Sequence, residues 1–489
     1  MKKILQFSLA LMLLSGLNPI LAQQRYLNEV FSSVTVNSNV KYGRNISVLT
    51  GQPVPQDLFM DIYQPAGDTA AKRPVIIYLH TGSFLPTPLN GSPTGSKTDS
   101  TVVEMCTQFA KRGYVACAVA YRLGWNPQSS DVDVRTGTLL NAVYRAIQDA
   151  KSSVRYLREN YSVGGNTYKV DTSKFIVGGQ GSGGYVAFAY GTLNKTSELN
   201  LSKFINSSTL QPYVLQQLAG NFAGTDSTFL NSPSQNHPTY SDKVNMIFNE
   251  GGAIGDSSWL EAGELPMVAF HVPSDPFAPF TYGAVIVPVL NYFVVNVSGS
   301  NDVIRRANRL GNNDIINNVT YNDPYTAAAN AVNNGVKSLM PFYLPGVQSG
   351  PWEWWDPANP NSAGALQTNP NMSKTKALAY IDTMQNYLAP RIAKVLGLPG
   401  APIGIKYVES GKNTVSIYPN PSIADIKINS KESIATVCIY DAIGNLVKEI
   451  RNVNSAQYSI ERRGLEAGIY LVKTITEKNQ QSIQKIVLQ

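Results

Sequence analysis

The sequence predicts two folded parts: an α/β domain with a mainly parallel sheet, helices on both faces and an inserted cap, and then a small C-terminal β-sandwich. Up to residue 398, apolar runs of strand length alternate with helical periodicity, which is typical of a parallel sheet packed between helices. After residue 413 the pattern changes to short alternating strands and turns, which favours an all-β module.

The expected strands of the first part are short and apolar. Residues 56–63 alternate apolar side chains between two faces, and residues 73–80 form the continuous apolar run of a strand covered on both sides. Similar strands are expected within 113–122, at 175–179 and at 267–272. Their order along the chain favours parallel pairing.

Three helices are expected between and after these strands. Apolar side chains recur at spacings of four and three between residues 139 and 161, which defines one face of a helix. A second helix is expected from Tyr185, and a last one over 374–398, interrupted near its end by Pro390.

Segment composition suggests where the parts begin and end. Lys2 and Lys3, an apolar run and a cleavage point after Ala22 predict a signal peptide. Long stretches rich in Asn, Ser and Gly exceed ordinary connection lengths and predict a cap over the sheet. The expected plan is a signal peptide (1–22), an α/β domain (23–398) with cap insertions near 195–262 and 277–345, a linker (399–412) and a β domain (413–489).

The charge balance argues against nucleic acid as a partner. Of the formal charge of +7, the signal peptide contributes +2, and residues 413–489 carry nine Lys and Arg against seven Asp and Glu. The remaining +3 is too dispersed for a basic binding surface. The three cysteines lack metal-ligand spacing, so we expect no metal site and no cofactor. A Cys106–Cys117 bridge and two free buried thiols both stay open.

Several motifs resemble those of lipases and esterases. The segment His80-Thr-Gly-Ser-Phe84 follows its strand as the H-G-G-x-F element does in those enzymes. Residues 118–124 and 146–157 look like the flanking strand and helix of the same carboxylesterase group. Together these elements resemble the α/β-hydrolase family, carboxylesterase/lipase-like, over roughly residues 40–398. The resemblance implies an oxyanion hole lined by Thr81, Gly82 and Ser83, with Thr81 in place of the family's first glycine.

The segment Gly178-Gly-Gln-Gly-Ser-Gly-Gly184 resembles the family's nucleophile elbow, G-x-S-x-G-G. Two alignments are open. The first matches three glycines and puts Gly181 at the position of the nucleophile, with the Ser182 N–H completing the oxyanion hole. The second makes Ser182 the nucleophile but puts Gln180 where the turn needs a small residue, so we prefer the first.

The segment Phe270-His-Val-Pro-Ser-Asp-Pro-Phe-Ala-Pro279 resembles the family's H-G-x-x-D-x-x-V-P element. The resemblance implies that Asp275 is the acid of the triad and that His271 and His80 are structural. His237 is expected to be a surface or turn histidine of the cap.

The histidine base of the triad is missing. Family order places it after the acid, near residues 345–352, yet no histidine follows His271. Residues 346–351 read Gly-Val-Gln-Ser-Gly-Pro and hold no group that accepts a proton near neutral pH.

Three tryptophans, Trp352, Trp354 and Trp355, follow this gap. Such a cluster more often packs a loop onto a core. Exposed indole faces would instead stack against carbohydrate or aryl groups, so these residues are candidate ligand contacts.

The C-terminal part resembles a second family. Val415-Ser-Ile-Tyr-Pro-Asn-Pro421, residues 437–447, residues 464–473 and Lys485-Ile-Val-Leu-Gln489 are similar to the type A sorting domain of the type IX secretion system. The resemblance implies that the type IX machinery of a Bacteroidota-like cell exports the protein to the cell surface or releases it.

Two functions follow from these observations. The leading hypothesis is an exported, catalytically inactive α/β-hydrolase-fold protein that binds a glycan or ester-like ligand, or an outer-membrane protein partner. The alternative is a secreted carboxylesterase or carbohydrate esterase that uses Ser182.

Overall fold

The computed structural model describes residues 25–287, 290–402, 415–442, 445–478 and 480–489. The expected signal peptide and most of the expected linker lie outside these residues. Contacts divide the chain into two compact units, one ending at Gly404 and one beginning at Ile405. In the part of the chain that the structure describes, no helix is long and apolar enough to cross a membrane.

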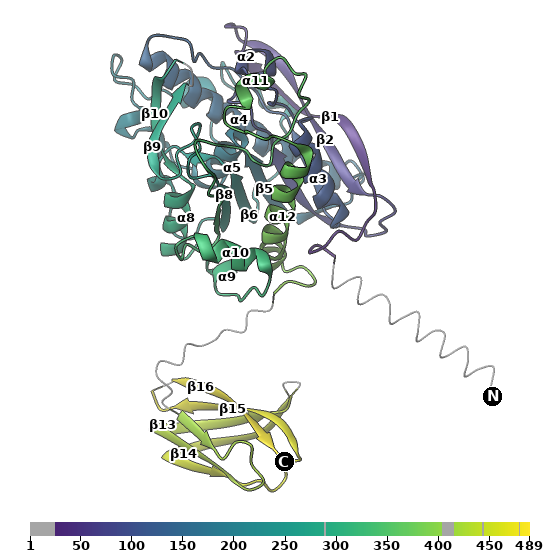
Figure 1. Ribbon diagram of the computed structural model, residues 1–489, viewed down its shortest axis with the longest axis vertical. Coiled ribbons are helices and arrows are strands. Elements are labelled where there is room, and N and C mark those ends of the chain that lie inside the picture. Colours follow the sequence, from purple (N-terminus) through teal and green to yellow (C-terminus); the bar gives the residue numbers. More distant parts are fainter. Residues whose placement is uncertain (1–24, 288–289, 403–414, 443–444, 479) are drawn as a thin grey trace, which may run out of the picture. The chain divides into compact units, whose positions relative to one another are not determined.

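The first unit is built on a sheet of eight strands in the order β1-β2-β4-β3-β5-β6-β8-β11 (Figure 1). The six strands from β4 to β11 pair in parallel, whereas β1 and β2 are antiparallel at one edge. The strands are β1 (Val34–Ser47), β2 (Val54–Pro65), β3 (Arg73–Leu79), β4 (Val115–Val119), β5 (Val170–Gln180), β6 (Met246–Glu250), β8 (Met267–His271) and β11 (Leu339–Pro341).

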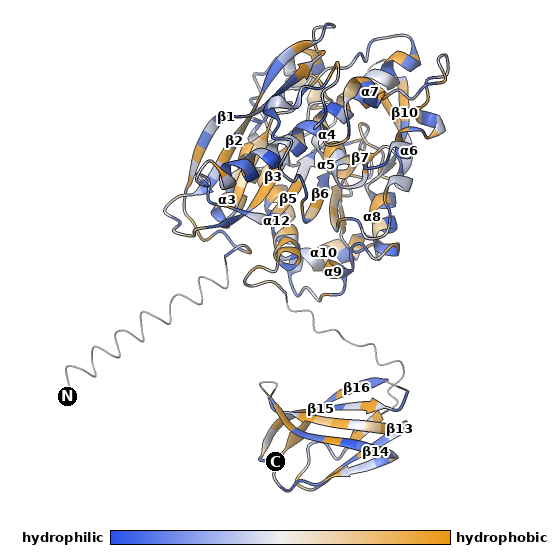
Figure 2. Cartoon of the chain, turned by 180° about the vertical axis from the view of Figure 1, so that it is seen from behind, coloured by the Kyte–Doolittle hydropathy of each residue, from blue (hydrophilic) through white to orange (hydrophobic). Residues whose placement is uncertain are grey.

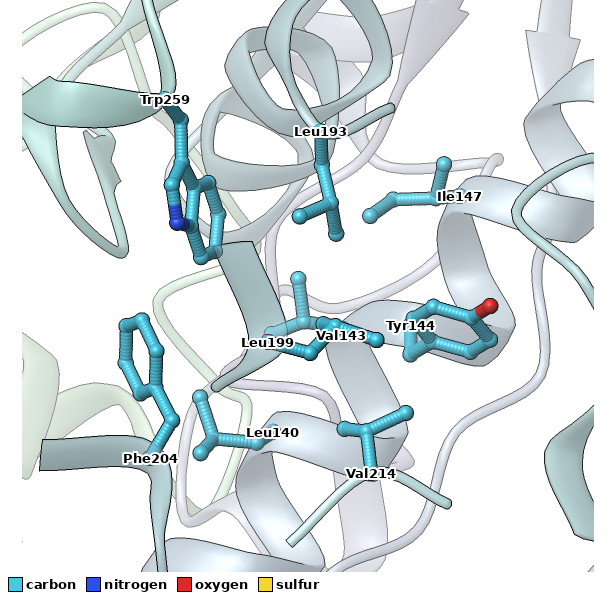
Figure 3. Close-up of a pocket in the computed structure, with 9 residues that line it drawn as sticks. All are labelled: Leu140, Val143, Tyr144, Ile147, Leu193, Leu199, Phe204, Val214 and Trp259. Atoms are coloured by element: carbon cyan, nitrogen blue, oxygen red, sulfur yellow. The ribbon is translucent and has the colours of Figure 1, made fainter. Parts of the chain in front are cut away.

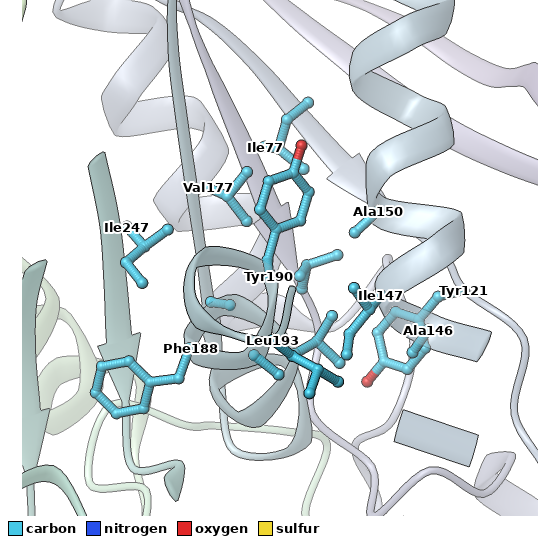
Figure 4. Packing of buried hydrophobic residues seen from close by; sticks show 14 of the residues in the cluster. Ile77, Tyr121, Ala146, Ile147, Ala150, Val177, Phe188, Tyr190, Leu193 and Ile247 are labelled. Carbon is cyan, nitrogen blue, oxygen red and sulfur yellow. The ribbon is translucent and has the colours of Figure 1, made fainter. Parts of the chain in front are cut away.

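Helices cover both faces of this sheet because its central strands are apolar on both sides. Every residue of β3 and β4 is buried, which the continuous apolar runs predicted. Figure 2 shows the central strands as the most hydrophobic part of the unit. One face packs against α4 (Val132–Ser162) and α5 (Ser182–Thr192), as Figure 4 shows, and the other against α3 (Ser100–Lys111) and α12 (Lys374–Leu396).

The two segments expected to form a cap each contain a strand of the central sheet. β6 lies within 195–262 and β11 within 277–345, so the cap prediction is wrong for these strands. β6 was missed because Asn249 and Glu250, although fully buried, read as polar loop residues. β11 has only three residues, too few to show a period.

The rest of the first segment runs along α4. Tyr144 donates to the carbonyl of Gly220 and the Gln148 amide donates to that of Ala219, so this segment covers the outer side of the helix. A cavity of about 30 Å³ with an apolar lining lies between α4, α5 and the segment (Figure 3). The short helices of the unit are α2 (Thr87–Asn90), α6 (Thr196–Leu199), η1 (Ser202–Phe204), α7 (Gln216–Ala219), η2 (Pro233–Gln235), η3 (Ser257–Trp259), α8 (Ser300–Arg309), α9 (Asp314–Asn317), α10 (Pro324–Val332) and α11 (Ser362–Ala365).

The second segment forms most of a small antiparallel sheet of three strands, β7-β10-β9. Its strands are β7 (Ala253–Ile254), β9 (Tyr282–Val287) and β10 (Tyr292–Gly299). The Thr136 hydroxyl and the Arg135 guanidinium of α4 donate to carbonyls of β10, which fixes this sheet to the helix. In Figure 1 it lies on the side of the unit away from β1 and β2.

Two further expectations concern Pro390 and the cysteines. The prediction that Pro390 interrupts the last helix is wrong, because α12 continues through it, with buried Leu388 and Ile392 on either side. Cys106 and Cys117 are free, buried thiols, and they belong to the cores on opposite faces of the sheet.

The second unit is a five-stranded antiparallel sheet with its own apolar core. Its long strand β13 pairs with β12 at one end, with β15 at the other and with β14 along most of its length. The strands are β12 (Val415–Tyr418), β13 (Ile426–Tyr440), β14 (Leu446–Ile460), β15 (Gly468–Thr476) and β16 (Gln481–Leu488).

Candidate active site

Gly181 forms the sharp turn between β5 and α5. Its φ of 51° and ψ of −119° lie in a region that residues with a Cβ rarely adopt. Its N–H donates to the carbonyl of Glu250 at 2.8 Å, which ties the turn to the end of β6. The neighbouring Gly183 permits close packing, since a Cβ there would lie 2.2 Å from the carbonyl oxygen of Leu79.

The hydroxyl of Thr81 occupies the space where a side chain at position 181 would begin. A Cβ built on Gly181 would lie 2.1 Å from Thr81 Oγ1 and 3.0 Å from Thr81 Cβ. The sequence indicated only that Thr81 stands in place of the family's first glycine. The contact with Gly181 could not be predicted without the fold.

The loop that carries Thr81 has an unusual backbone. Gly82, Ser83 and Phe84 all have positive φ, at 121°, 52° and 56°. The indole of Trp125 donates to the Ser83 carbonyl at 2.7 Å, and this contact helps to hold the loop in place. Within the described residues, the backbone N–H groups of Gly82, Ser83 and Ser182 have no acceptor.

The Ser182 side chain is buried and engaged. Its hydroxyl lies 3.0 Å from the Tyr121 hydroxyl, which itself donates to the carbonyl of His80 at 2.8 Å. A phenol has one proton, so Ser182 must be the donor toward Tyr121. The Ser182 hydroxyl therefore donates to a phenol and not to an imidazole. Burial raises the pKa of this phenol above its ordinary value.

His80 lies behind Tyr121 and is neutral. Its ring stacks on the Tyr121 ring with centroids 4.5 Å apart, and Nδ1 donates to the Thr81 carbonyl at 2.5 Å. Burial lowers the His80 pKa to about 4. The histidine supports the loop backbone.

Asp275 lies in the loop after β8, two residues before Phe277. Its Oδ1 accepts the N–H groups of Phe277 and Ala278 at 2.7 and 3.3 Å, yet burial raises its pKa to about 7. His271 bonds through its ring nitrogens to Ser300 Oγ and to the Ala278 carbonyl, at 2.7 and 3.0 Å. Among the described residues, no histidine therefore pairs with Asp275.

The third histidine is remote from this centre. His237 Nε2 lies 3.0 Å from the Tyr42 carbonyl of β1, and Nδ1 lies 2.5 Å from Glu159 of α4. It is a half-buried turn histidine that joins the loop after η2 to the edge of the sheet.

Carboxyl groups that the sequence did not single out gather near Asp275. Burial and the charges of Asp99, Asp275 and Glu250 raise the pKa of Glu353 to about 8. Burial also raises the pKa of Glu250 to about 8, although Tyr78 donates to it at 2.6 Å, and that of Asp99 to about 6. Within the described residues, these carboxyls are not arranged as a group that could hold a metal ion.

The tryptophans are mostly interior. Trp352 and Trp355 are 2% and 8% exposed, and the Trp355 indole donates to Ser362 Oγ at 3.0 Å. These two side chains fit the expectation that such a cluster packs a loop onto a core, and the alternative of exposed stacking faces is wrong for them. Trp354 is half-buried against the core beside α12.

The chain was compared with known proteins. No curated protein matches it. The solved structures that resemble it include esterase 2 of the planctomycete Thermogutta terrifontis in its native form, at 18% identity over 68% of this chain and 88% of that one, with a TM-score of 0.37. The apo form of the same esterase is 16% identical over 73% and 94%, with a TM-score of 0.37.

Two families match parts of the sequence. Residues 60–279 match the family described as BD-FAE, and residues 416–489 match the family described as secretion system C-terminal sorting domain. The sorting domain indicates that the protein is secreted or displayed at the cell surface. The chain thus combines an esterase-like domain of the α/β-hydrolase family with a type IX sorting domain, as its motifs predicted.

Proposed function

We propose that this protein acts outside the cell by binding, and that it has lost the covalent chemistry of serine hydrolases. One observation carries the proposal: the residue at the apex of the β5–α5 turn is Gly181, and the Thr81 hydroxyl fills the space beside it. The turn angles support the alignment in which Gly181 stands at the nucleophile position. That position has no side chain with which to attack a carbonyl.

The missing base supports the same proposal. Asp275 has no histidine partner among the described residues, and Glu353, close to the expected position of the base, has a pKa near 8. A carboxyl that keeps its proton at neutral pH does not serve as a general base. Loss of nucleophile and base together removes about 10⁶ in turnover relative to an intact triad.

The binding side of the site is retained. Within the described residues, the N–H groups of Gly82, Ser83 and Ser182 have no acceptor. They can therefore donate to a carbonyl or other oxygen of a ligand. We propose an ester-like or glycan ligand here, or an outer-membrane protein partner, in a Bacteroidota-like cell that exports the chain through its signal peptide and sorting domain.

The competing hypothesis is an esterase that uses Ser182. Its hydroxyl donates to Tyr121, and burial keeps the adjacent His80 neutral with a pKa near 4. Activity would require Tyr121 to relay the proton from Ser182. Burial raises the pKa of Tyr121, so the phenol stays protonated at neutral pH and can take the Ser182 proton only after it has passed on its own.

A fluorophosphonate probe separates the two hypotheses. We expect no labelling of the purified protein and no hydrolysis of a short-chain aryl ester above the level of the Ser182→Ala variant. Stoichiometric labelling at Ser182 that the alanine variant abolishes would establish the esterase and end our proposal.

The Gly181→Ser variant tests the loss of the base. We expect no restored turnover, with or without Thr81→Gly to make room, because no described side chain is placed to activate the new hydroxyl. Substantial hydrolysis by the double variant would reveal a proton acceptor at the site.

A further inference from the structure

A second cleft of the first unit is lined by none of the residues of the elbow. It has a volume of about 640 Å³ and lies between the β1–β2 turn, the loop after β4, the first half of α4 and residues 213–230. Its walls are largely apolar and include Leu49, Trp125, Leu215, Leu218 and Leu230. The cleft shares no residue with the Gly181 turn or the Asp275 loop, and its volume suits a small molecule.

Arg145 is the charged residue of this lining. It projects from α4 and is 4% exposed. Its Nη2 donates to the Gly124 carbonyl at 2.7 Å. Within the described residues, Nε has no acceptor and Nη1 has none either.

The carboxylate that acts on Arg145, Asp149, is bonded to another arginine. Both oxygens of Asp149 accept from Nε of Arg122 at 3.0 Å, and Arg122 is fully buried. Asp149 attracts the Arg145 guanidinium only through space, and the charge of Arg122 opposes this attraction, so within the described residues Arg145 has no ion pair.

An unpaired buried cation is costly. Burial without an ion pair disfavours the charged form, and it lowers the pKa of Arg145 to about 9. The guanidinium still carries its charge at neutral pH. An anion in the cleft would remove the penalty and supply the missing acceptors.

The surroundings of Arg145 define the rest of the ligand. Leu49 and Leu218, which both line the cleft, are 38% and 41% exposed. The Trp125 indole is fixed in place by its bond to the Ser83 carbonyl. A rigid aromatic wall and exposed leucines favour an apolar body on the ligand.

We propose that this cleft binds a small organic carboxylate, with the carboxylate on Arg145 and an apolar, preferably aromatic body between Leu49, Leu218 and Trp125. The site goes beyond the function proposed above. Neither the nucleophile position nor the oxyanion donors take part, although Trp125 borders both the cleft and the loop of Ser83.

Calorimetric titration of the purified full-length protein tests the site. The probes are 4-phenylbutyrate and its uncharged analogue 4-phenylbutanamide, which differ only at the group that would meet Arg145. We expect the carboxylate to bind at least about tenfold more tightly than the amide, as a charge-assisted hydrogen bond requires. Equal affinities, or no binding of the carboxylate, would refute the proposal.

Variants at two positions locate the binding. Arg145→Met should remove the preference for the carboxylate. Leu218→Glu places a like charge in the cleft and should weaken 4-phenylbutyrate binding about tenfold, whereas the matched Leu218→Gln should change it less than about threefold. Because Leu218 is exposed, this pair decides the matter even if Arg145→Met fails to fold. An undiminished affinity in Leu218→Glu would place the ligand elsewhere.

Discussion

At the scale of single residues, Gly181 and Thr81 depend on each other. The turn needs a residue that accepts its positive φ, and the Thr81 hydroxyl needs the space that a Cβ would take. A side chain introduced at position 181 alone therefore meets the Thr81 hydroxyl. The proposed loss of the nucleophile is therefore hard to undo by a single substitution at position 181.

Stability measurements can detect this dependence. Gly181→Ala should destabilise the first unit by roughly 1–3 kcal/mol, because an alanine is strained at this positive φ and its Cβ clashes with Thr81. Thr81→Gly in the same chain should recover part of the loss. Urea unfolding of both single variants and the double variant gives the coupling energy.

Gly263 provides the control for backbone strain. It also has a positive φ, 87°, but a Cβ there would meet nothing within 4 Å. Gly263→Ala thus reports the strain without the clash. If Gly181→Ala costs no more than Gly263→Ala, Thr81 does not fill the space.

Glu250 should make stability depend on pH. Its pKa is raised from an ordinary value near 4.5 to about 8, so between these values the folded protein binds a proton that the unfolded chain has lost. The contribution of Glu250 to the free energy of unfolding is complete below pH 4.5. It falls by about 1.4 kcal/mol per pH unit until pH 8.

Glu250→Gln keeps an acceptor for Tyr78 and removes the titration. Urea unfolding at pH 5.5 and pH 8 should show a smaller loss of stability across this range for the variant, and a variant more stable than the parent at pH 8. Parallel pH profiles would mean that Glu250 titrates normally.

At the scale of elements, the cavity beside α4 offers a direct test of packing. Val143→Ile adds one methyl group next to a space of about 30 Å³ and should stabilise the protein by up to about 1 kcal/mol. Val134→Ile makes the same change at an exposed position of the same helix and should be neutral. Thermal unfolding compares the two, and destabilisation by Val143→Ile would show that the cavity does not accept the group.

The sequence predicted those elements that have a strong period of their own. β3, β4 and α4 combine continuous burial or a clear apolar stripe with adequate length, so local pattern was enough. β6 and β11 were missed because buried polar residues or short length hide the period. The continuity of α12 through Pro390 was missed because tertiary packing outweighs the local preference.

The residues of the candidate site show the same difference between what a local motif predicts and what only the fold reveals. Gly181, Ser182 and Asp275 follow strands that motifs identify, so their neighbourhood could be predicted. Glu250 and Glu353 could not, since their raised pKa values depend on burial between segments distant in sequence. The unpaired state of Arg145 could likewise not be predicted, because only the fold shows that Arg122 bonds to the Asp149 carboxylate.

At the scale of the whole molecule, the two units should fold independently. The buried residues of the central sheet's two cores all precede residue 404, and those of the third core all follow it. A chain ending at Pro402 should therefore keep the melting temperature of the first unit within about 2 °C, by circular dichroism. A larger drop would mean that the sorting domain stabilises its passenger.

The free N–H groups beside Gly181 have a kinetic consequence. In an enzyme such donors hold an intermediate only until water releases it. In the function proposed above nothing consumes the ligand, so the lifetime of the complex depends on the dissociation rate alone. A domain that resembles an esterase would then serve as a receptor whose occupancy reports the concentration of an intact ester outside the cell.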